Sequence, residues 1–266
     1  MLFTLTRFYK SVKFQSMNIK ELIRAIETLA PPALAEAWDN TGLLIEPPPA
    51  RTVSTVLLTI DLTEAVANEA IKQNADFIIA YHPLFFGGIQ RLNQSNPQSR
   101  TVMRLIENRI GVYSPHTALD ATADGVNDWL ASLLGGEIQT EGLARVVYFK
   151  TPAAFASLVK TVKQKLNLKT VQTFAPAKKI KTVALCAGAG IDEIKHISAD
   201  CFLTGEMKHH DALAAAQNGT GIILCGHTET ERGYLPVFAK KLKPLCPAVR
   251  FIISKQDKSL LQYSAN

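Results

Sequence analysis

Ile78-Ile79-Ala80-Tyr81-His82-Pro83-Leu84-Phe85-Phe86-Gly87-Gly88 is the stretch from which the fold and a candidate site can be worked out. Its short apolar run predicts a buried strand, which is followed by a histidine, a proline and a glycine pair. Open α/β sheets bind their ligands beyond the carboxyl ends of the strands. The stretch therefore predicts a site at the end of this strand, with His82 in it.

The same pattern returns twice along the chain. Gly111 to Asp120 and Ile222 to Glu231 each combine a strand-like apolar run with a histidine and a carboxylate four residues later. At this spacing two side chains lie on one face of a helix, and in an irregular loop they can also converge. Three strand ends that each carry a histidine suggest one shared metal site.

The candidate ligands are three imidazoles and two carboxylates: His82, His116, Asp120, His227 and Glu231. This set suits Zn, Mn, Fe or Co rather than Ca or Mg alone. A bridging carboxylate would let the site hold two ions, activate water and attack a phosphoryl or carbon centre. For any one histidine a packed, hydrogen-bonded role is about as good an interpretation, and the pairing with acids favours the metal.

Length and composition are those of an ordinary globular protein. The chain has 266 residues, 47% of them hydrophobic and 20% charged, which is enough for one large or two modest domains. No apolar run approaches the ~20 residues that a membrane-spanning helix needs. The four cysteines form no C-x-x-C pair, which favours buried side chains over a cysteine zinc site.

Residues 1–16 have the composition of a mitochondrial transit peptide: they contain Arg7, Lys10, Lys13 and several hydroxyls, but no acid. A plain unstructured N-terminus is the alternative. Without these three positive charges the net charge falls from +6 to +3. That remainder, with no basic cluster interleaved with aromatics, argues against nucleic acid as a partner. Initiation at Met17 would give a cytoplasmic form.

Strands alternate with helices of 10–12 residues, which predicts an α/β fold of βαβ units with a mainly parallel sheet. We expect one α/β lobe from residues 17–134 and 221–266, carrying the metal ligands, and a second from residues 135–220. Asp61 with Glu64 resembles a capping box at the start of one helix. Another helix is expected from about Glu229 to Leu242, and no motif is found between 135 and 177.

Two further stretches contain candidates for chemistry. Glu206, Lys208 and His210 lie where a strand gives way to a helix, and they could act as general acid or base or meet a substrate phosphate. A solvated helix start explains them at least as well. Gly188 and Gly190 follow a strand and open a helix, as phosphate-binding turns do. Because the third glycine of G-x-G-x-x-G is missing, a structural turn is the simpler interpretation.

Taken together, four motifs in this order resemble the NIF-three-like family, whose bacterial members are often labelled type-2 homologues of GTP cyclohydrolase I. The resemblance covers the chain from about Ile19 to its C-terminus. The motifs are Trp38-Asp39-Asn40-x-Gly42-Leu43, Tyr81-His82-Pro83-Leu84-Phe85-Phe86, Ser114-Pro115-His116-Thr117-Ala118-x-Asp120 and Gly226-His227-x-Glu229-Thr230-Glu231.

The resemblance implies a two-lobed α/β fold with a strand-end metal site, assembled as a homohexameric ring. Some members carry an inserted domain, for which this chain is too short. Carried over by motif, the ligands are the five residues named above. One departure is that many members read His-His-Pro where this chain has Tyr81-His82-Pro83. Tyr81 could ligate, bond to bound water or leave one metal weakly held, so we expect one or two metals per chain.

Two functions remain open. The first is a metal-dependent hydrolase acting on a small nucleotide or phosphorylated substrate; the cyclohydrolase label enters only by resemblance, since nothing in the motifs reads a guanine edge. The second is a non-catalytic protein that handles a transition metal or serves as a scaffold for protein partners. Catalysis needs an open coordination position with acid or base groups nearby, whereas storage or transfer does not. A nucleic-acid clamp, suggested by the ring, has poor charge support.

Overall fold

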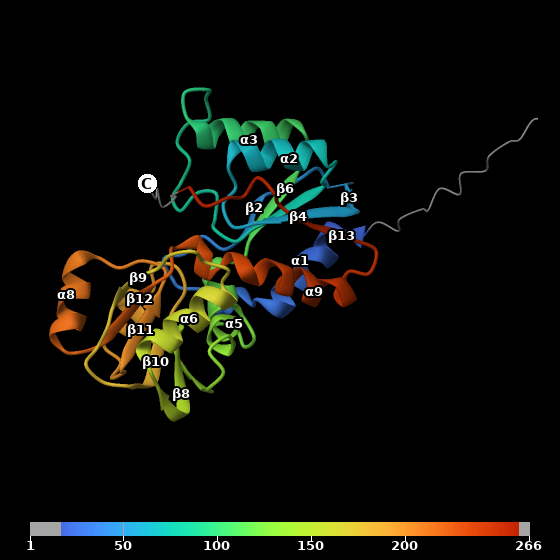
Figure 1. Ribbon diagram of the computed structural model, residues 1–266. Coiled ribbons are helices and arrows are strands. Elements are labelled where there is room, and N and C mark those ends of the chain that lie inside the picture. The colour runs from blue at the N-terminus through green and yellow to red at the C-terminus, as the bar shows by residue number, and fades with distance from the viewer. Residues whose placement is uncertain (1–16, 50, 261–266) are drawn as a thin grey trace, which may run out of the picture.

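The computed structural model describes residues 17–49 and 51–260, and two sheets with helices on their faces pack side by side (Figure 1). One hydrophobic core cluster includes residues of both, for example Leu58 and Phe77 from the first sheet and Val147 and Leu203 from the second. The mixed α/β fold is therefore confirmed. The expected transit segment, residues 1–16, lies outside the described residues.

The first sheet has five strands in the order β13-β4-β5-β6-β2, of which only β2 is antiparallel to its neighbour. Its strands are short and largely buried, as expected when helices cover both faces. Their bounds are Gly42–Ile45 (β2), Thr55–Thr59 (β4), Phe77–Ala80 (β5), Gly111–Ser114 (β6) and Arg250–Ile253 (β13). A small ribbon, β1 (Met17–Asn18) with β3 (Thr52–Val53), stands beside it.

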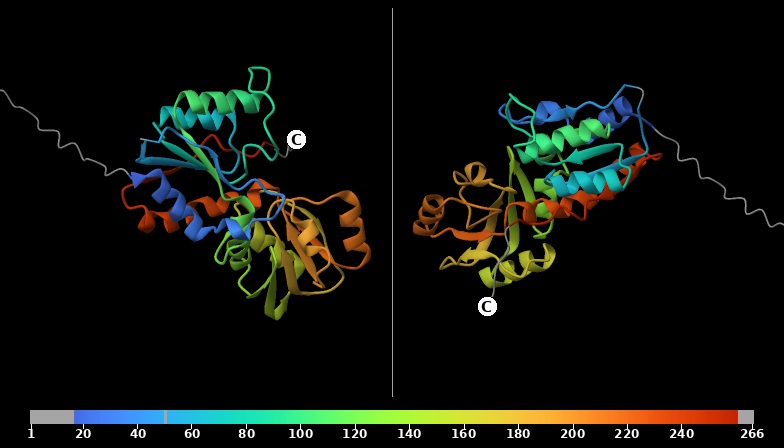
Figure 2. Two further views of the ribbon diagram at one scale, coloured as in Figure 1. Left: turned by 180° about the vertical axis from the view of Figure 1, so that it is seen from behind. Right: turned by 90° about the horizontal axis from the view of Figure 1, so that it is seen from above.

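Two pairs of helices cover this sheet, one pair on each face (Figures 1 and 2). Alternate residues of the strands point to opposite sides, so Leu57 and Ile78 pack under one pair while Leu58 and Ile79 pack under the other. The first pair is α2 (Glu64–Lys72) and α3 (Pro97–Glu107), and the second is α1 (Ile19–Leu29) and α9 (Leu235–Leu245).

The second sheet has six strands in the order β7-β8-β10-β11-β12-β9, and only β10, β11 and β12 run parallel to one another. Helices α5 and α6 contribute to the core on one face, and α7 and α8 to that on the other. The bounds are Glu137–Glu141 (β7), Ala144–Ala153 (β8), Gln172–Phe174 (β9), Ile180–Leu185 (β10), Cys201–Thr204 (β11), Gly221–Leu224 (β12), Val126–Ser132 (α5), Phe155–Lys165 (α6), Ile191–Ile194 (α7) and His209–Gln217 (α8).

The structure differs from the sequence expectations at four places. Strand β12 pairs with β11 and β9, so residues 221–224 belong to the second sheet and the expected boundary at 221 falls one strand too early. Strand β7 was not anticipated. Thr63, not Asp61, caps α2, because its hydroxyl accepts from the Val66 amide. The helix expected from Glu229 begins at Leu235, after two 3-10 turns, η2 (Thr228–Thr230) and η3 (Arg232–Tyr234).

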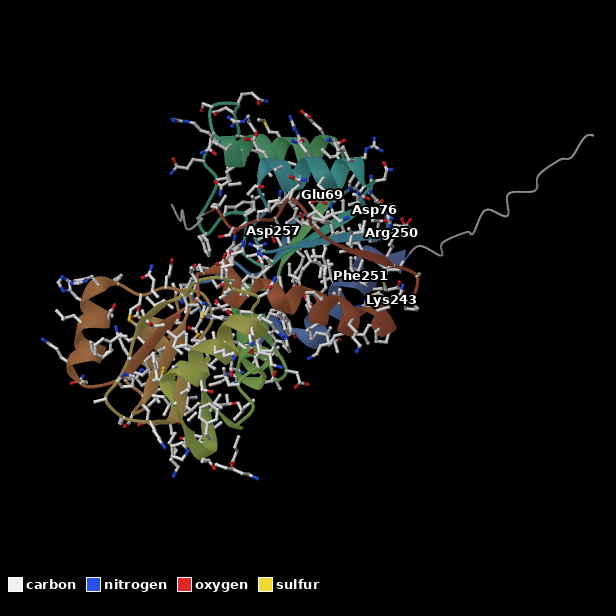
Figure 3. All side chains as sticks on the ribbon, viewed as in Figure 1. Glu69, Asp76, Lys243, Arg250, Phe251 and Asp257 are labelled. Carbon is white, nitrogen blue, oxygen red and sulfur yellow. The ribbon has the colours of Figure 1, made fainter. Side chains whose placement is uncertain are left out.

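The chain after β13 runs back over the first unit and is held there by two carboxylates (Figure 3). Glu69 of α2 accepts from the backbone amides of Lys255 and Gln256, at 3.0 and 3.1 Å. Asp257 accepts from the Ile60 amide at 2.7 Å and pairs with Arg232 at 2.5 Å. Within the described ranges no helix is long and apolar enough to cross a bilayer.

Asp76 organises the start of the central strands. Its carboxylate accepts from the amides of Ser54 and Thr55, at 2.8 and 3.1 Å, and from the Arg51 guanidinium at 2.9 Å. Burial raises the pKa of this carboxyl, but the hydrogen bonds lower it more, and the net shift is below the ordinary value. The ionised form therefore stabilises the folded state.

We expect Asp76→Asn to lower the free energy of unfolding by about 2 kcal/mol near neutral pH, the worth of hydrogen bonds to a charged group. The contribution is present above the ordinary pKa of 3.8 and is lost as pH falls through the lowered folded-state pKa. The free energies of unfolding of the variant and the parent, measured by urea denaturation, should therefore become equal in acid. Glu107→Gln, at an exposed position on α3, is the control, and an equal loss at all pH values would contradict the assignment.

Candidate metal centre

Three of the five expected ligands converge where the two sheets meet. His82 follows β5 of the first sheet, while His227 and Glu231 follow β12 of the second. The Nε2 atom of His82 lies 3.6 Å from Oε2 of Glu231, and Nε2 of His227 lies 3.3 Å from Oε1. One ligand atom from each of the three residues falls within 4.8 Å of the others, a spacing that could hold a metal ion.

The strand ends explain why these side chains meet. The β5 ladder continues past Ala80, since the His82 amide donates to Ile60 at 3.1 Å before Pro83 ends it. After β12, Gly226 has φ +92°, a conformation that favours glycine, and turns the chain into His227. The turn η2 then folds Glu231 back toward His227.

Each histidine of the predicted set is held through Nδ1 by a carboxylate from another segment. Such a partner fixes the tautomer and the orientation of an imidazole, and leaves Nε2 to act as a ligand. The pairs are His82 with Asp61 (2.9 Å), His227 with Glu206 (3.0 Å) and His116 with Asp39 (2.8 Å).

Sequence reasoning missed two of these partners. Asp61 was assigned to a helix cap, and Asp39 was named within a motif of the family resemblance. The signal for Asp61 was available, because it follows β4 by two residues, and β4 lies beside β5 in a parallel sheet. Glu206 was expected as a catalytic candidate, which stays a prediction, and the structure shows it hydrogen-bonded to Nδ1 of His227.

The Glu231 carboxylate is a buried charged group at the centre of the site. Its side chain is 2% exposed, and within the described residues Oε2 is buried without a hydrogen-bond partner. Gly188, with φ +62°, packs against it: a Cβ there would lie 2.5 Å from Oε1 of Glu231 and 3.0 Å from Nε2 of His227. A buried carboxylate oxygen that accepts no hydrogen bond is costly unless a positive charge lies close to it. The residues therefore fit a bound cation.

A proton on His82 compensates part of the negative charge of Glu231 when no metal is bound. Burial lowers the pKa of His82, but the carboxylates of Asp61 and Glu231 outweigh burial and raise the pKa to about 10. A metal would have to displace this proton, since only the neutral imidazole is a ligand. The site therefore favours a positive charge in either form, a proton on His82 or a metal cation.

His116 and Asp120 lie beside the three converging residues. Both belong to α4 (His116–Ala121), so the four-residue spacing is helical. The His116 ring lies 5.3 Å from that of His82, and Tyr81 donates its hydroxyl to Oδ1 of Asp120 at 2.6 Å. Burial raises the pKa of Asp120 to about 6, against the opposing effect of the Tyr81 hydrogen bond. Their role as ligands stays a prediction.

The remaining candidates stand apart from the centre. Lys208 and His210 are exposed at the start of α8, and in the described part of the chain neither is hydrogen-bonded to the converging residues. Gly190 packs against Cys186, whose Sγ would lie 2.6 Å from a Cβ. Of the two glycines proposed for substrate binding, only Gly188 touches the centre.

Comparison with known proteins shows to which family the chain is similar. A family model described as Duf34/NIF3 (NGG1p interacting factor 3) matches residues 17–259. The chain is 44% identical over 244 residues to the NIF3 homologue of Schizosaccharomyces pombe, covering 84% of this chain and 88% of that one. It is 39% identical over 259 residues to NGG1-interacting factor 3 of Saccharomyces cerevisiae, covering 85% and 90%.

The fold is also that of a solved structure. A Bacillus cereus protein related to NIF3 superposes with a TM-score of 0.84 at 21% identity, covering 94% of this chain and 100% of that one. At this level of identity the likeness concerns the fold alone.

We expect Asp61→Asn to weaken metal affinity roughly 10–100-fold, the usual effect of removing a carboxylate behind a histidine ligand. Competition against a chromophoric chelator measures the change. Asp124→Asn, at a side chain 88% exposed, removes the same charge elsewhere and should leave the affinity unchanged. Equal affinities for Asp61→Asn and the parent chain would show that Asp61 does not orient a ligand.

Proposed function

This chain belongs to the Duf34/NIF3 family, and from that premise we propose that it is a metal-dependent hydrolase. The observation that carries the proposal is the convergence of His82, His227 and the buried Glu231, with both imidazoles oriented by carboxylates. The substrate proposed is a small nucleotide or another phosphorylated molecule.

Zn, Mn, Fe or Co suits this set of nitrogen and oxygen ligands. When bound, such a metal supplies Lewis acidity and makes water nucleophilic at neutral pH. His82, His227 and Glu231 would hold it. Asp61 and Glu206 keep the imidazoles in the tautomer that presents Nε2 to the centre.

Tyr81 decides between one metal and two. Its hydroxyl engages Asp120, a carboxylate that a second ion would need, and the bond is 2.6 Å long. We propose that Tyr81 keeps Asp120 away from a metal, so that the centre is mononuclear. Asp120, with its pKa of about 6, can then hold or release a proton near neutral pH.

The hexameric ring and the mitochondrial address remain proposals of the same kind. The ring is implied by the family resemblance, and the address by the acid-free composition of residues 1–16. Light scattering of the purified chain and fractionation of cells that express it would test each.

A second function has its own support. Lys208 and His210, the proposed acid, base or phosphate groups, are exposed at the start of α8. The yeast relative is named an interacting factor. A protein that handles a metal or binds protein partners without catalysis would need the ligands but not these groups.

A panel of phosphomonoesters, nucleoside monophosphates and nucleoside triphosphates, assayed with each of the four metals, separates the two functions. We expect hydrolysis that requires a metal and falls at least 100-fold in Glu231→Gln, because the variant loses a ligand and its charge. Metal content must be measured in the same samples.

Glu107→Gln, on the surface of α3, is the matched control and should retain full activity. A fully metal-loaded chain that hydrolyses no member of the panel would favour the non-catalytic function. Activity that survives in Glu231→Gln would exclude the centre described here.

A further inference from the structure

Two large aromatic side chains are exposed beside the candidate centre. Trp38 is 62% exposed and Phe86 57%, whereas Phe174, another exposed aromatic residue of the described chain, is 41% exposed. Single exposed apolar side chains are common on protein surfaces, whereas exposed apolar side chains that lie together often mark a binding site. Neither residue has a role in the metal site.

The two rings contact each other and one histidine of the predicted ligand set. The ring centroids of Trp38 and Phe86 are 6.3 Å apart, and those of Trp38 and His116 are 5.9 Å apart. Phe86 lies 5.8 Å from His116. Trp38 and Phe86 thus form an aromatic platform at the edge of the centre.

Hydrogen bonds fix the platform in place. Asp39, next to Trp38, binds Nδ1 of His116 at 2.8 Å and the Thr117 amide at 3.1 Å. Asn40 donates to the carbonyl of Phe85 at 2.6 Å, which ties the two platform segments together. The chain segments that carry the two exposed rings are therefore held in place, as expected of a binding surface.

Resting on the proposed function, we propose that the substrate of the centre carries a planar aromatic ring, of the nucleobase type, that stacks on Trp38 and Phe86. Ring stacking on protein aromatics tolerates different bases, because every base has a π-face. The platform would hold the ring while the group to be hydrolysed reaches His82, His227 and Glu231.

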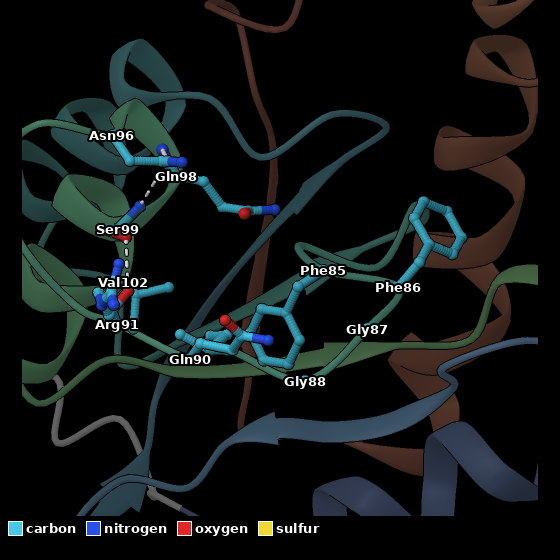
Figure 4. Close-up of a pocket in the computed structure, with 11 residues that line it drawn as sticks. Phe85, Phe86, Gly87, Gly88, Gln90, Arg91, Asn96, Gln98, Ser99 and Val102 are labelled. Carbon is cyan, nitrogen blue, oxygen red and sulfur yellow. Dashed lines mark hydrogen bonds between the residues drawn. The ribbon is translucent and has the colours of Figure 1, made fainter.

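A cavity on the neighbouring loop offers another place for a ring. It has a volume of about 340 Å³, and its polar wall includes Gln90, Asn96 and Ser99 (Figure 4). Figure 4 shows the Phe86 ring turned away from Asn96 and Ser99. Phe86 also lines the cavity, so the two places are separated by Gln90, which only binding in the cavity would need, and by Trp38, which only binding on the platform would need.

Trp38 provides its own signal. The chain has two tryptophans, so Trp129→Phe leaves Trp38 as the only one. Adenosine is the probe, because it carries a base but no phosphate that could bind to surface lysines. We expect saturable quenching of Trp38 emission by adenosine and none by ribose, both in the protein as purified and after chelator treatment.

In this background Phe86→Ala should weaken adenosine binding about tenfold, corresponding to about 1.4 kcal/mol, within the range for base stacking. Phe174→Ala is the matched control and Gln90→Ala tests the cavity; neither should change the affinity. Equilibrium dialysis of labelled adenosine with the chain that retains Trp129 repeats the measurement if Trp129→Phe disturbs folding.

Unsaturable quenching, or equal affinities for Phe86→Ala and Phe174→Ala, would overturn the platform. So would Trp38 emission shielded from acrylamide before ligand is added, because a second copy of the chain would then cover the rings. Adenosine binding without metal uptake would instead overturn the proposed hydrolase and leave the platform standing. The two failures are therefore distinguishable.

Discussion

The burial of the Glu231 carboxylate between two histidines is the constraint on which the site depends. A charge 2% exposed is tolerated only with a compensating charge or hydrogen bonds. Gly188 leaves room for it where a side chain would collide. Asp257 connects the two ligand segments. It forms an ion pair with Arg232, next to Glu231, and accepts a hydrogen bond from the amide of Ile60, next to Asp61. The ligand segments of the two sheets are thereby held in register.

Strand ends were predictable from the sequence because an apolar run followed by His and Gly is a local signal. His82, His227 and Glu231 were found in this way. Asp39 was not, because its partner lies 77 residues away. Asp61 lies 21 residues from its partner and could be paired with His82 only by placing β4 beside β5. The assignment of β12 to the first lobe failed for the same reason: strand pairing is not local. Periodicity indicates a strand, but its neighbour depends on the whole fold.

Tyr81 and the aromatic platform add two proposed properties to the site that its ligands alone do not provide: the restriction to one metal and the recognition of a ring. Tyr81 donates a hydrogen bond to Asp120. The carboxylate that would suit a second metal therefore already has a partner. Asp39 serves both features, since it orients His116 and anchors the segment that carries Trp38. The proposed metal number and the proposed ring recognition would therefore depend on residues that are neighbours in space.

Anomalous diffraction from crystals of the chain purified without chelators, with elemental mass spectrometry of the same protein, tests the central claim most directly. The account predicts one divalent transition metal per chain, bound by Nε2 of His82, Nε2 of His227 and the Glu231 carboxylate. A second ion at Asp120 would show that Tyr81 does not restrict the centre to one metal. Protein without metal, or with metal bound elsewhere, would contradict the account.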